Sequence, residues 1–229
     1  MRLHVLQHEV FEEPGYILHW AKEKQFSVSF TRFHMQETLP VHEAYDMLVI
    51  MGGPMGVHDE DKYPWLAVEK AFIREAIDHQ KKIVGVCLGS QLLAHVLGAR
   101  VYRNRWKEIG FYDVNHTGVK HPLIDGLPKR FTAFHWHGDT YDLPHECQLL
   151  YRSEACENQA YVWKNRILGL QFHLEVTPDL LELFLDNADA ELQENSPFIQ
   201  SAAEMRAKTH LLTDINRILG KMLDNFLQL

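Results

Sequence analysis

A cysteine at the centre of a glycine-flanked turn is the residue of this chain best placed to do chemistry. The stretch Gly85-Val86-Cys87-Leu88-Gly89-Ser90-Gln91 follows the apolar run Ile83-Val84 and precedes the apolar run Leu92-Leu93-Ala94. This order predicts a strand, a sharp corner and a helix, with Cys87 displayed at the corner. Peptide N–H groups at the start of the helix favour the thiolate, which is the nucleophilic form. We therefore predict that Cys87 is a catalytic nucleophile; the alternative is a buried core cysteine beside a glycine-rich turn.

A histidine and a glutamate two residues apart offer the base that a cysteine nucleophile requires. If the stretch from Leu168 to Glu175 is a strand, its alternation places Gln171, His173 and Glu175 on one face. The imidazole of His173 would take the thiol proton, while the Glu175 carboxylate accepts a hydrogen bond from the other ring nitrogen. The alternative is a half-exposed strand end whose polar residues face water.

These residues together resemble the class I glutamine amidotransferases, a family with a Cys-His-Glu triad. The turn matches the family pattern Gly-x-Cys-x-Gly-x-Gln, and the downstream stretch matches Gln-Phe-His-Pro-Glu except that Leu174 replaces proline. Met51-Gly52-Gly53-Pro54, after an apolar run, resembles the family's oxyanion loop. The resemblance covers roughly residues 1–185 and is closest to the stand-alone GMP synthase-like members.

The resemblance implies a reaction and a set of roles. Cys87 would attack the side-chain amide of glutamine, giving a glutamyl thioester and ammonia before water releases glutamate. The backbone N–H groups of Gly53 and Leu88 would stabilise the oxyanion. Gln91 would orient the substrate, and the segment around His137 would contact its amino-acid head group. The resemblance implies no cofactor.

The segment His135-Trp136-His137-Gly138-Asp139 raises a metal hypothesis. Two histidines separated by one residue on a strand can bind one ion, with Asp139 or His173 as a further ligand. No third ligand has a diagnostic spacing, and the resemblance places this segment in the wall of the glutamine pocket. We therefore expect no metal site.

Three classes of function are open at this point. The first is glutamine hydrolysis that supplies ammonia to a separate synthase, because the chain has neither a Walker loop nor a Ser-Gly-Gly-x-Asp-Ser loop for ATP. The second is a γ-glutamyl hydrolase or peptidase that uses the same nucleophile on a larger γ-glutamyl conjugate. The third is a non-enzymatic binding or regulatory module on the same fold.

Composition narrows the setting of the protein. The 229 residues are 46% hydrophobic and carry a net charge of −8, with no Lys/Arg run longer than two. This composition disfavours a nucleic-acid or membrane partner. No apolar stretch approaches the roughly 18 to 20 residues that span a bilayer, and three cysteines are too few for a disulfide framework. We expect a cytoplasmic protein.

The elements expected around these residues alternate between strand and helix. Strands are predicted at 3–6, 27–31, 47–51 and just before Cys87, with helices at 14–24 and from Pro64. This order predicts an α/β fold: a flavodoxin-like, doubly wound, mostly parallel sheet with a nucleophile elbow. The portion from Arg100 to Trp163 is predicted to add shorter, more antiparallel strands, among them 111–114 and 148–151.

Helices are expected to close the chain. Thr177-Pro178-Asp179 predicts a helix start with Thr177 as cap, followed by a buried face that ends with Ala188. We place an amidotransferase-like domain at residues 1–190 and a helical extension, packed on the same domain, at residues 191–229. Its apolar residues at helical spacing leave a homodimer or a docked partner protein as the alternative.

Overall fold

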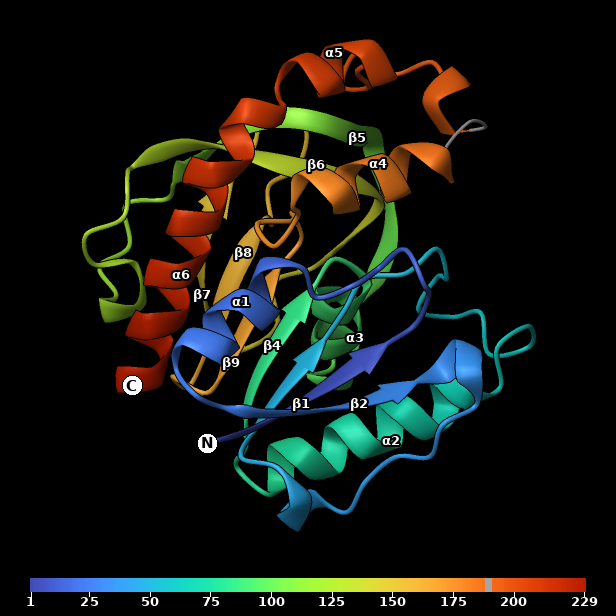
Figure 1. The fold of residues 1–229 in the computed structure, drawn as a ribbon, viewed down its shortest axis with the longest axis vertical. Helices are drawn as coiled ribbons and strands as arrows, with labels where there is room; N and C mark the ends of the chain where they lie inside the picture. The colour runs from blue at the N-terminus through green and yellow to red at the C-terminus, as the bar shows by residue number, and fades with distance from the viewer. Residues whose placement is uncertain (188–190) are drawn as a thin grey trace.

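One nine-stranded sheet organises the molecule (Figure 1). The computed structural model describes residues 1–187 and 191–229. The strand order is β2-β1-β3-β4-β9-β8-β7-β5-β6, in which the first five strands run parallel and the others pair antiparallel. The parallel half has the order of a flavodoxin-like sheet, as predicted. The strands are β1 (Arg2–Gln7), β2 (Ser27–Arg32), β3 (Met47–Ile50), β4 (Lys82–Val86), β5 (Val101–His116), β6 (Arg130–Tyr141), β7 (Cys147–Arg152), β8 (Ala160–Trp163) and β9 (Ile167–Leu170).

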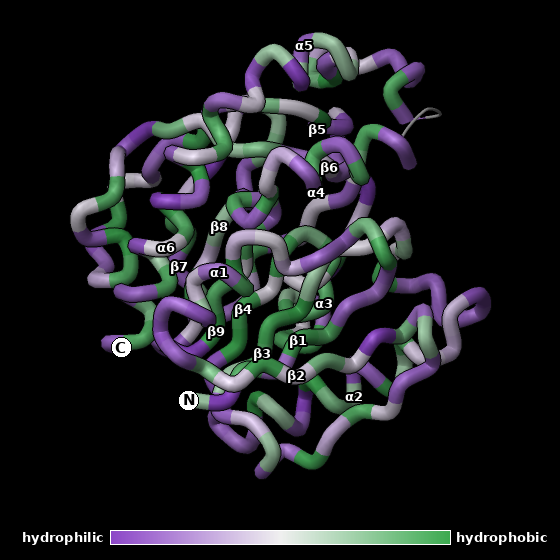
Figure 2. The backbone as a smooth tube through the Cα atoms, in the orientation of Figure 1, coloured by the Kyte–Doolittle hydropathy of each residue, from purple (hydrophilic) through white to green (hydrophobic). Residues whose placement is uncertain are grey.

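Helices cover both faces of the parallel half. Along β3, Met47 and Val49 join the core shared with α1 and α6, whereas Leu48 and Ile50 join the core shared with α2 and α3. Both faces are therefore dry, and the tube in Figure 2 is green along the central strands. The α-helices are α1 (Tyr16–Glu23), α2 (Trp65–Asp78), α3 (Leu88–Val96), α4 (Pro178–Asp186), α5 (Ala202–Ala207) and α6 (Leu212–Gln228).

The C-terminal part of the chain returns to the sheet. The Thr177 hydroxyl caps α4 by accepting the Leu180 N–H at 3.3 Å, with Pro178 in the first turn as predicted. The buried face of α6, from Leu212 to Phe226, joins the same core as α1, and Figure 1 shows the two helices together. Ala188 lies outside the described residues, and the division of the chain at residue 190 stays a prediction. Among the described helices, none has both the length and the apolar character of a membrane-spanning segment.

Two element predictions need correction. The strand predicted from Leu168 to Glu175 ends at Leu170, and beyond it only His173 makes a bridge, to Phe134. The short strand expected at 111–114 is part of β5, a strand of 16 residues. β5 pairs with β6 over most of its length, so the antiparallel portion forms a long hairpin.

Candidate active site

Cys87 occupies a strained corner between β4 and α3. Its backbone has φ 50° and ψ −110°, in a region that side-chain-bearing residues rarely adopt. A Cβ at Gly85 would lie 2.5 Å from the Gly89 carbonyl oxygen, and one at Gly89 would collide with the Ile50 carbonyl. Only glycine fits at these two positions, because the backbones of the helix and strands approach so closely. The Ser90 hydroxyl holds the corner by donating to the Cys87 carbonyl at 2.7 Å.

His173 and Glu175 form a buried pair beside the corner. His173 Nδ1 lies 2.6 Å from Glu175 Oε1, and both side chains are excluded from solvent. The Asn216 side chain of α6 donates to the carbonyls of Leu174 and Val176, at 2.7 and 3.0 Å, and fixes the segment on either side of Glu175. The half-exposed strand end considered as an alternative is therefore wrong.

The charges of the thiol and the imidazole depend on each other. Nδ1 donates to the Glu175 carboxylate, so Nε2 of His173 is left for Cys87, and it has no hydrogen-bond partner among the described residues. Burial lowers the pKa of His173, but Glu175 and Cys87 raise it to a value well above its usual one. Burial raises the pKa of the Cys87 thiol, and His173 opposes this rise. The imidazole is therefore a strong proton acceptor for this thiol.

Two backbone N–H groups adjoin the nucleophile. The backbone N–H of Leu88 lowers the pKa of the Cys87 thiol. Gly53 follows β3 and lines the pocket that contains Cys87. No described residue accepts a hydrogen bond from the Gly53 N–H, so this donor is free for a ligand. The predicted oxyanion donors thus lie at the same site as the predicted nucleophile.

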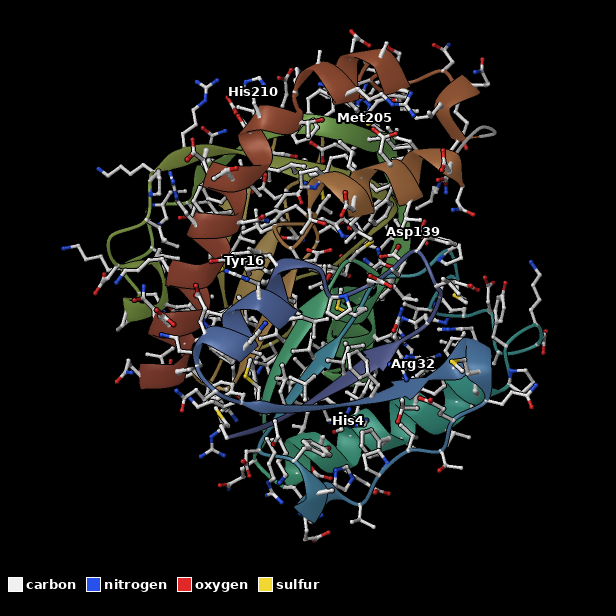
Figure 3. The ribbon with its side chains drawn as sticks, viewed as in Figure 1. His4, Tyr16, Arg32, Asp139, Met205 and His210 are labelled. Carbon is white, nitrogen blue, oxygen red and sulfur yellow. The ribbon has the colours of Figure 1, made fainter. Side chains whose placement is uncertain are left out.

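The site opens into a pocket of about 550 Å³ at the carboxyl edge of the parallel strands. Gln91 lines it and donates to Gln171 Oε1 at 3.1 Å, while Gln171 Nε2 lies 3.8 Å from the Cys87 sulfur. At the rim, Lys107 pairs with Glu191 at 2.9 Å and Arg103 with Asp139 at 3.8 Å; Figure 3 labels Asp139. The basic residues of the pocket are thus already paired with carboxylates.

The side chain of His137 turns away from the substrate side of the pocket wall. Its imidazole is buried between Glu108 Oε2, 3.2 Å from Nε2, and the Asp139 carbonyl, 3.0 Å from Nδ1. His135 and Glu108 gather with it closely enough to hold a metal ion, so Glu108, not Asp139 or His173, is the third member of this cluster. The Gln159 amide nitrogen lies 2.7 Å from Glu108 Oε2 and 3.4 Å from each imidazole. Gln159 thus contacts all three potential ligands, and the described residues fit a hydrogen-bond network better than a metal site.

Glu12 is a buried pocket residue that no motif predicted. Its Oε2 has no hydrogen-bond partner among the described residues, and a Cβ at Gly52 would lie 2.5 Å from that oxygen. Burial raises the pKa of Glu12 to about 7, with His173 lowering it and Glu175 raising it. The only sequence signal was its place just after the first strand, at the edge where α/β sheets bind ligands.

The chain is similar to known proteins over most of its length. A family model described as glutamine amidotransferase class-I matches residues 16–187. The glutamine amidotransferase-like protein YfeJ of Salmonella typhimurium is 35% identical, over 98% of this chain and 96% of that protein. A GMP synthase of Thermomicrobium roseum is 36% identical over 56% of this chain, which matches only 23% of that protein's length. A solved glutamine amidotransferase of Thermotoga maritima is 31% identical, with a TM-score of 0.91 over 100% of this chain and 99% of its own.

Proposed function

The chain belongs to the class I glutamine amidotransferase family and is an amide hydrolase, and from this premise we propose that it hydrolyses the side-chain amide of glutamine with Cys87, His173 and Glu175 as its triad. The observation that carries the proposal is the buried His173–Glu175 pair, 2.6 Å apart, with the free Nε2 beside the Cys87 thiol. Buried polar atoms that serve only the structure normally have hydrogen-bond partners. A buried Nε2 without a partner therefore points to a functional role. Because the family consists of amide hydrolases, we set aside the hypothesis of a purely non-enzymatic module.

The proposed reaction proceeds in two half-reactions. The thiol proton of Cys87 passes to His173 Nε2 as the sulfur bonds to the amide carbon, and the oxyanion accepts hydrogen bonds from the Gly53 and Leu88 N–H groups. The C–N bond then breaks, His173 returns the proton to the leaving nitrogen, and ammonia departs from a glutamyl thioester. Water, deprotonated by His173, attacks the thioester and releases glutamate and the thiol.

We propose that the ammonia serves a synthase on a separate protein. The GMP synthase of Thermomicrobium roseum matches this chain over only 23% of its length. The sequence given contains neither of the ATP-binding loops that synthase chemistry uses. A docked synthase would receive ammonia from the pocket at the carboxyl edge of the sheet, where Cys87 lies.

The pocket supports a second candidate, hydrolysis of a larger γ-glutamyl conjugate. Its volume of about 550 Å³ lies within the range of roughly 300–1,000 Å³ typical of sites for drug-sized ligands. A small amino acid such as glutamine leaves part of such a space unfilled. The same nucleophile, base and oxyanion donors would serve this reaction, with an amine other than ammonia as the leaving group.

One assay separates the two candidates. The purified chain is incubated with glutamine, γ-glutamyl peptides and γ-glutamyl amines, and ammonia and glutamate are measured separately, with the Cys87→Ser variant as the blank. The amidotransferase proposal expects equal amounts of ammonia and glutamate from glutamine. Rapid glutamate release from a γ-glutamyl peptide or amine, with little from glutamine, favours the hydrolase instead.

A further inference from the structure

A second buried histidine lies behind the loop that carries Gly53. His8, just after β1, places Nδ1 2.8 Å from the Gly52 carbonyl oxygen and Nε2 2.9 Å from Glu69 Oε1 of α2. Both His8 and Glu69 are fully buried. The pairing joins three segments that are far apart in the sequence, and none of the motifs includes either residue.

The partners of His8 determine its protonation. A carbonyl oxygen can only accept a hydrogen bond, so Nδ1 must carry a hydrogen. The Glu69 carboxylate is the partner of Nε2 and holds the imidazole in this orientation. Burial lowers the pKa of His8, but Glu69, the Gly52 carbonyl and Glu12 raise it above its usual value. The Gly52 carbonyl thus requires the hydrogen on Nδ1 in either charge state of the ring.

Aromatic packing fixes the plane of this imidazole. The Phe33 and Trp65 rings pack against it, nearly parallel to it, with centroids 5.6 and 5.5 Å away and interplanar angles of 7° and 14°, and they stack on each other at 4.5 Å. An imidazole that packs against these two rings and is hydrogen-bonded at both nitrogens has little freedom to rotate. It is a rigid hydrogen-bond donor aimed at one carbonyl.

That carbonyl belongs to the same peptide as the Gly53 N–H. The described chain has no cis peptide bond, and in a trans peptide the C=O and N–H point in opposite directions. With the Gly52 carbonyl held by His8, the Gly53 N–H points away from His8, and Gly53 lines the Cys87 pocket. Two adjacent glycines would otherwise let this peptide rotate easily.

We propose that His8, held by Glu69, is a positioning residue that fixes the Gly52–Gly53 peptide with its N–H directed at the oxyanion. The inference rests on the proposed function, because the N–H matters only if a carbonyl is attacked at Cys87. Glu69 orients the His8 imidazole as Glu175 orients that of His173. The His8–Glu69 pair, however, fixes the orientation of a peptide plane. His8 touches neither the substrate nor the reacting atoms.

Two isosteric variants test the proposal. The side-chain nitrogen of Asn lies where Nδ1 of histidine lies, and that of Gln lies near the place of Nε2. His8→Asn thus keeps a donor for the Gly52 carbonyl and loses the contact with Glu69, whereas His8→Gln does the reverse. We expect His8→Asn to keep most of kcat and His8→Gln to lose roughly 10- to 100-fold in kcat with little change in KM, because one oxyanion donor is worth about 10²–10³.

A matched histidine serves as control. His42 stacks on Phe72 at 4.5 Å and pairs with Glu75 of α2 at 3.2 Å, but does not touch the glycine loop. His42→Gln should leave kcat unchanged. Thermal unfolding of every variant sets an assay temperature at which all are folded.

Two further readouts do not depend on glutamine turnover. Alkylation of Cys87 by iodoacetamide forms no oxyanion, so its rate should be the same in His8→Gln and the wild type. A crystal structure of His8→Gln should show the Gly52–Gly53 peptide turned or in two orientations. Equal kcat losses in the Asn and Gln variants, a parallel loss of alkylation, or an unmoved peptide would each overturn the proposal. A wild type that cleaves no γ-glutamyl amide contradicts the proposed function, while the peptide orientation still decides the role of His8.

Discussion

At the scale of single residues, the three cysteines differ in their surroundings. All three are free thiols, and burial raises the pKa of Cys147 to about 12 and of Cys156 to about 11. Among the described residues, a histidine opposes this rise only at Cys87. We expect a glutamine-like electrophile to label Cys87 stoichiometrically and to spare the other two, as read by peptide mass spectrometry. Labelling shared among the three, or undiminished in Cys87→Ser, would argue against an activated thiol.

The relay predicts unequal losses at its two members. His173→Asn removes the proton acceptor, whereas Glu175→Gln keeps the acceptor and weakens only its orientation and charge. The loss of kcat in Glu175→Gln should therefore be about 100-fold smaller than the loss in His173→Asn. Steady-state kcat across pH measures this difference. Wild-type activity of Glu175→Gln at every pH would remove the carboxylate from the mechanism.

Glu12 predicts a measurable shift in the reactivity of the nucleophile. Its negative charge raises the pKa of Cys87, and its own pKa of about 7 means that this charge develops near neutral pH. Glu12→Gln should lower the pKa of Cys87, so that iodoacetamide alkylation rises at a lower pH than in the wild type. Glu13→Gln, an exposed neighbour, is the matched control. A profile that coincides with the wild type would place Glu12 outside electrostatic reach of the thiol.

The residue types explain which parts of the site could be predicted. Cys87, His173 and Glu175 lie in short local patterns, so their spacing alone pointed to their chemistry. His8 and Glu69 are 61 positions apart and pair only because β1 and α2 pack together. No local pattern contains such a pair, and the same holds for the contact of Glu12 with Gly52.

At the scale of elements, the elbow predicts a steep cost for one methyl group. A Cβ at Gly89 would collide with the Ile50 carbonyl of β3, a backbone atom that cannot rotate away. Gly89→Ala should lower the free energy of unfolding by roughly 1–3 kcal/mol or more, the range of overpacked cores. Gly56→Ala is the control, because its Cβ would meet only the side chain of Asp59, whose nearest oxygen would lie 3.3 Å away. Urea unfolding compares them, and equal stabilities would mean that α3 can shift away from β3.

The strand predictions succeeded where the residues of a strand determine its limits. They failed where a contact with another strand determines them. Apolar runs such as β3 are buried on both faces, and their limits were predicted to within a residue. After Leu170 the alternation continues, but the backbone leaves the ladder because His173 bonds to Phe134 of β6. The alternation of apolar and polar residues could not predict that this segment bonds to a different strand.

At the scale of the whole molecule, the Glu108 network joins the antiparallel half behind the pocket. Glu108 of β5 accepts from Ser153 at 3.0 Å and from Gln159 at 2.7 Å, and it contacts His137 of β6 at 3.2 Å. Ser153 follows β7 and Gln159 precedes β8. One carboxylate therefore links four segments of the chain. Neither composition nor periodicity indicated that a buried anion would hold this half of the sheet.

This network predicts how the fold fails in acid. Burial raises the pKa of Glu108, but its histidine and hydroxyl partners lower it from 4.5 to about 2, and burial lowers the pKa of His135 from 6.5 to about 4. A depressed carboxyl stabilises the fold fully above pH 4.5, and this stabilisation is lost as the pH falls toward 2. A histidine kept neutral adds a loss between pH 6.5 and 4. Both effects act in the same direction, so stability should decline on acidification.

Glu108→Gln tests this account of acid unfolding. The variant loses the anion and should be less stable at pH 7 by about 1–3 kcal/mol, the cost of an unsatisfied buried partner. Its melting temperature should then change less than that of the wild type between pH 5 and 3, because the titrating carboxyl is gone. Glu182→Gln, in an exposed pair with Arg206, should melt like the wild type at both pH values. Parallel curves for Glu108→Gln and the wild type would show that acid unfolds the protein through other carboxylates. The network would then hold the pocket wall without determining the acid stability of the protein.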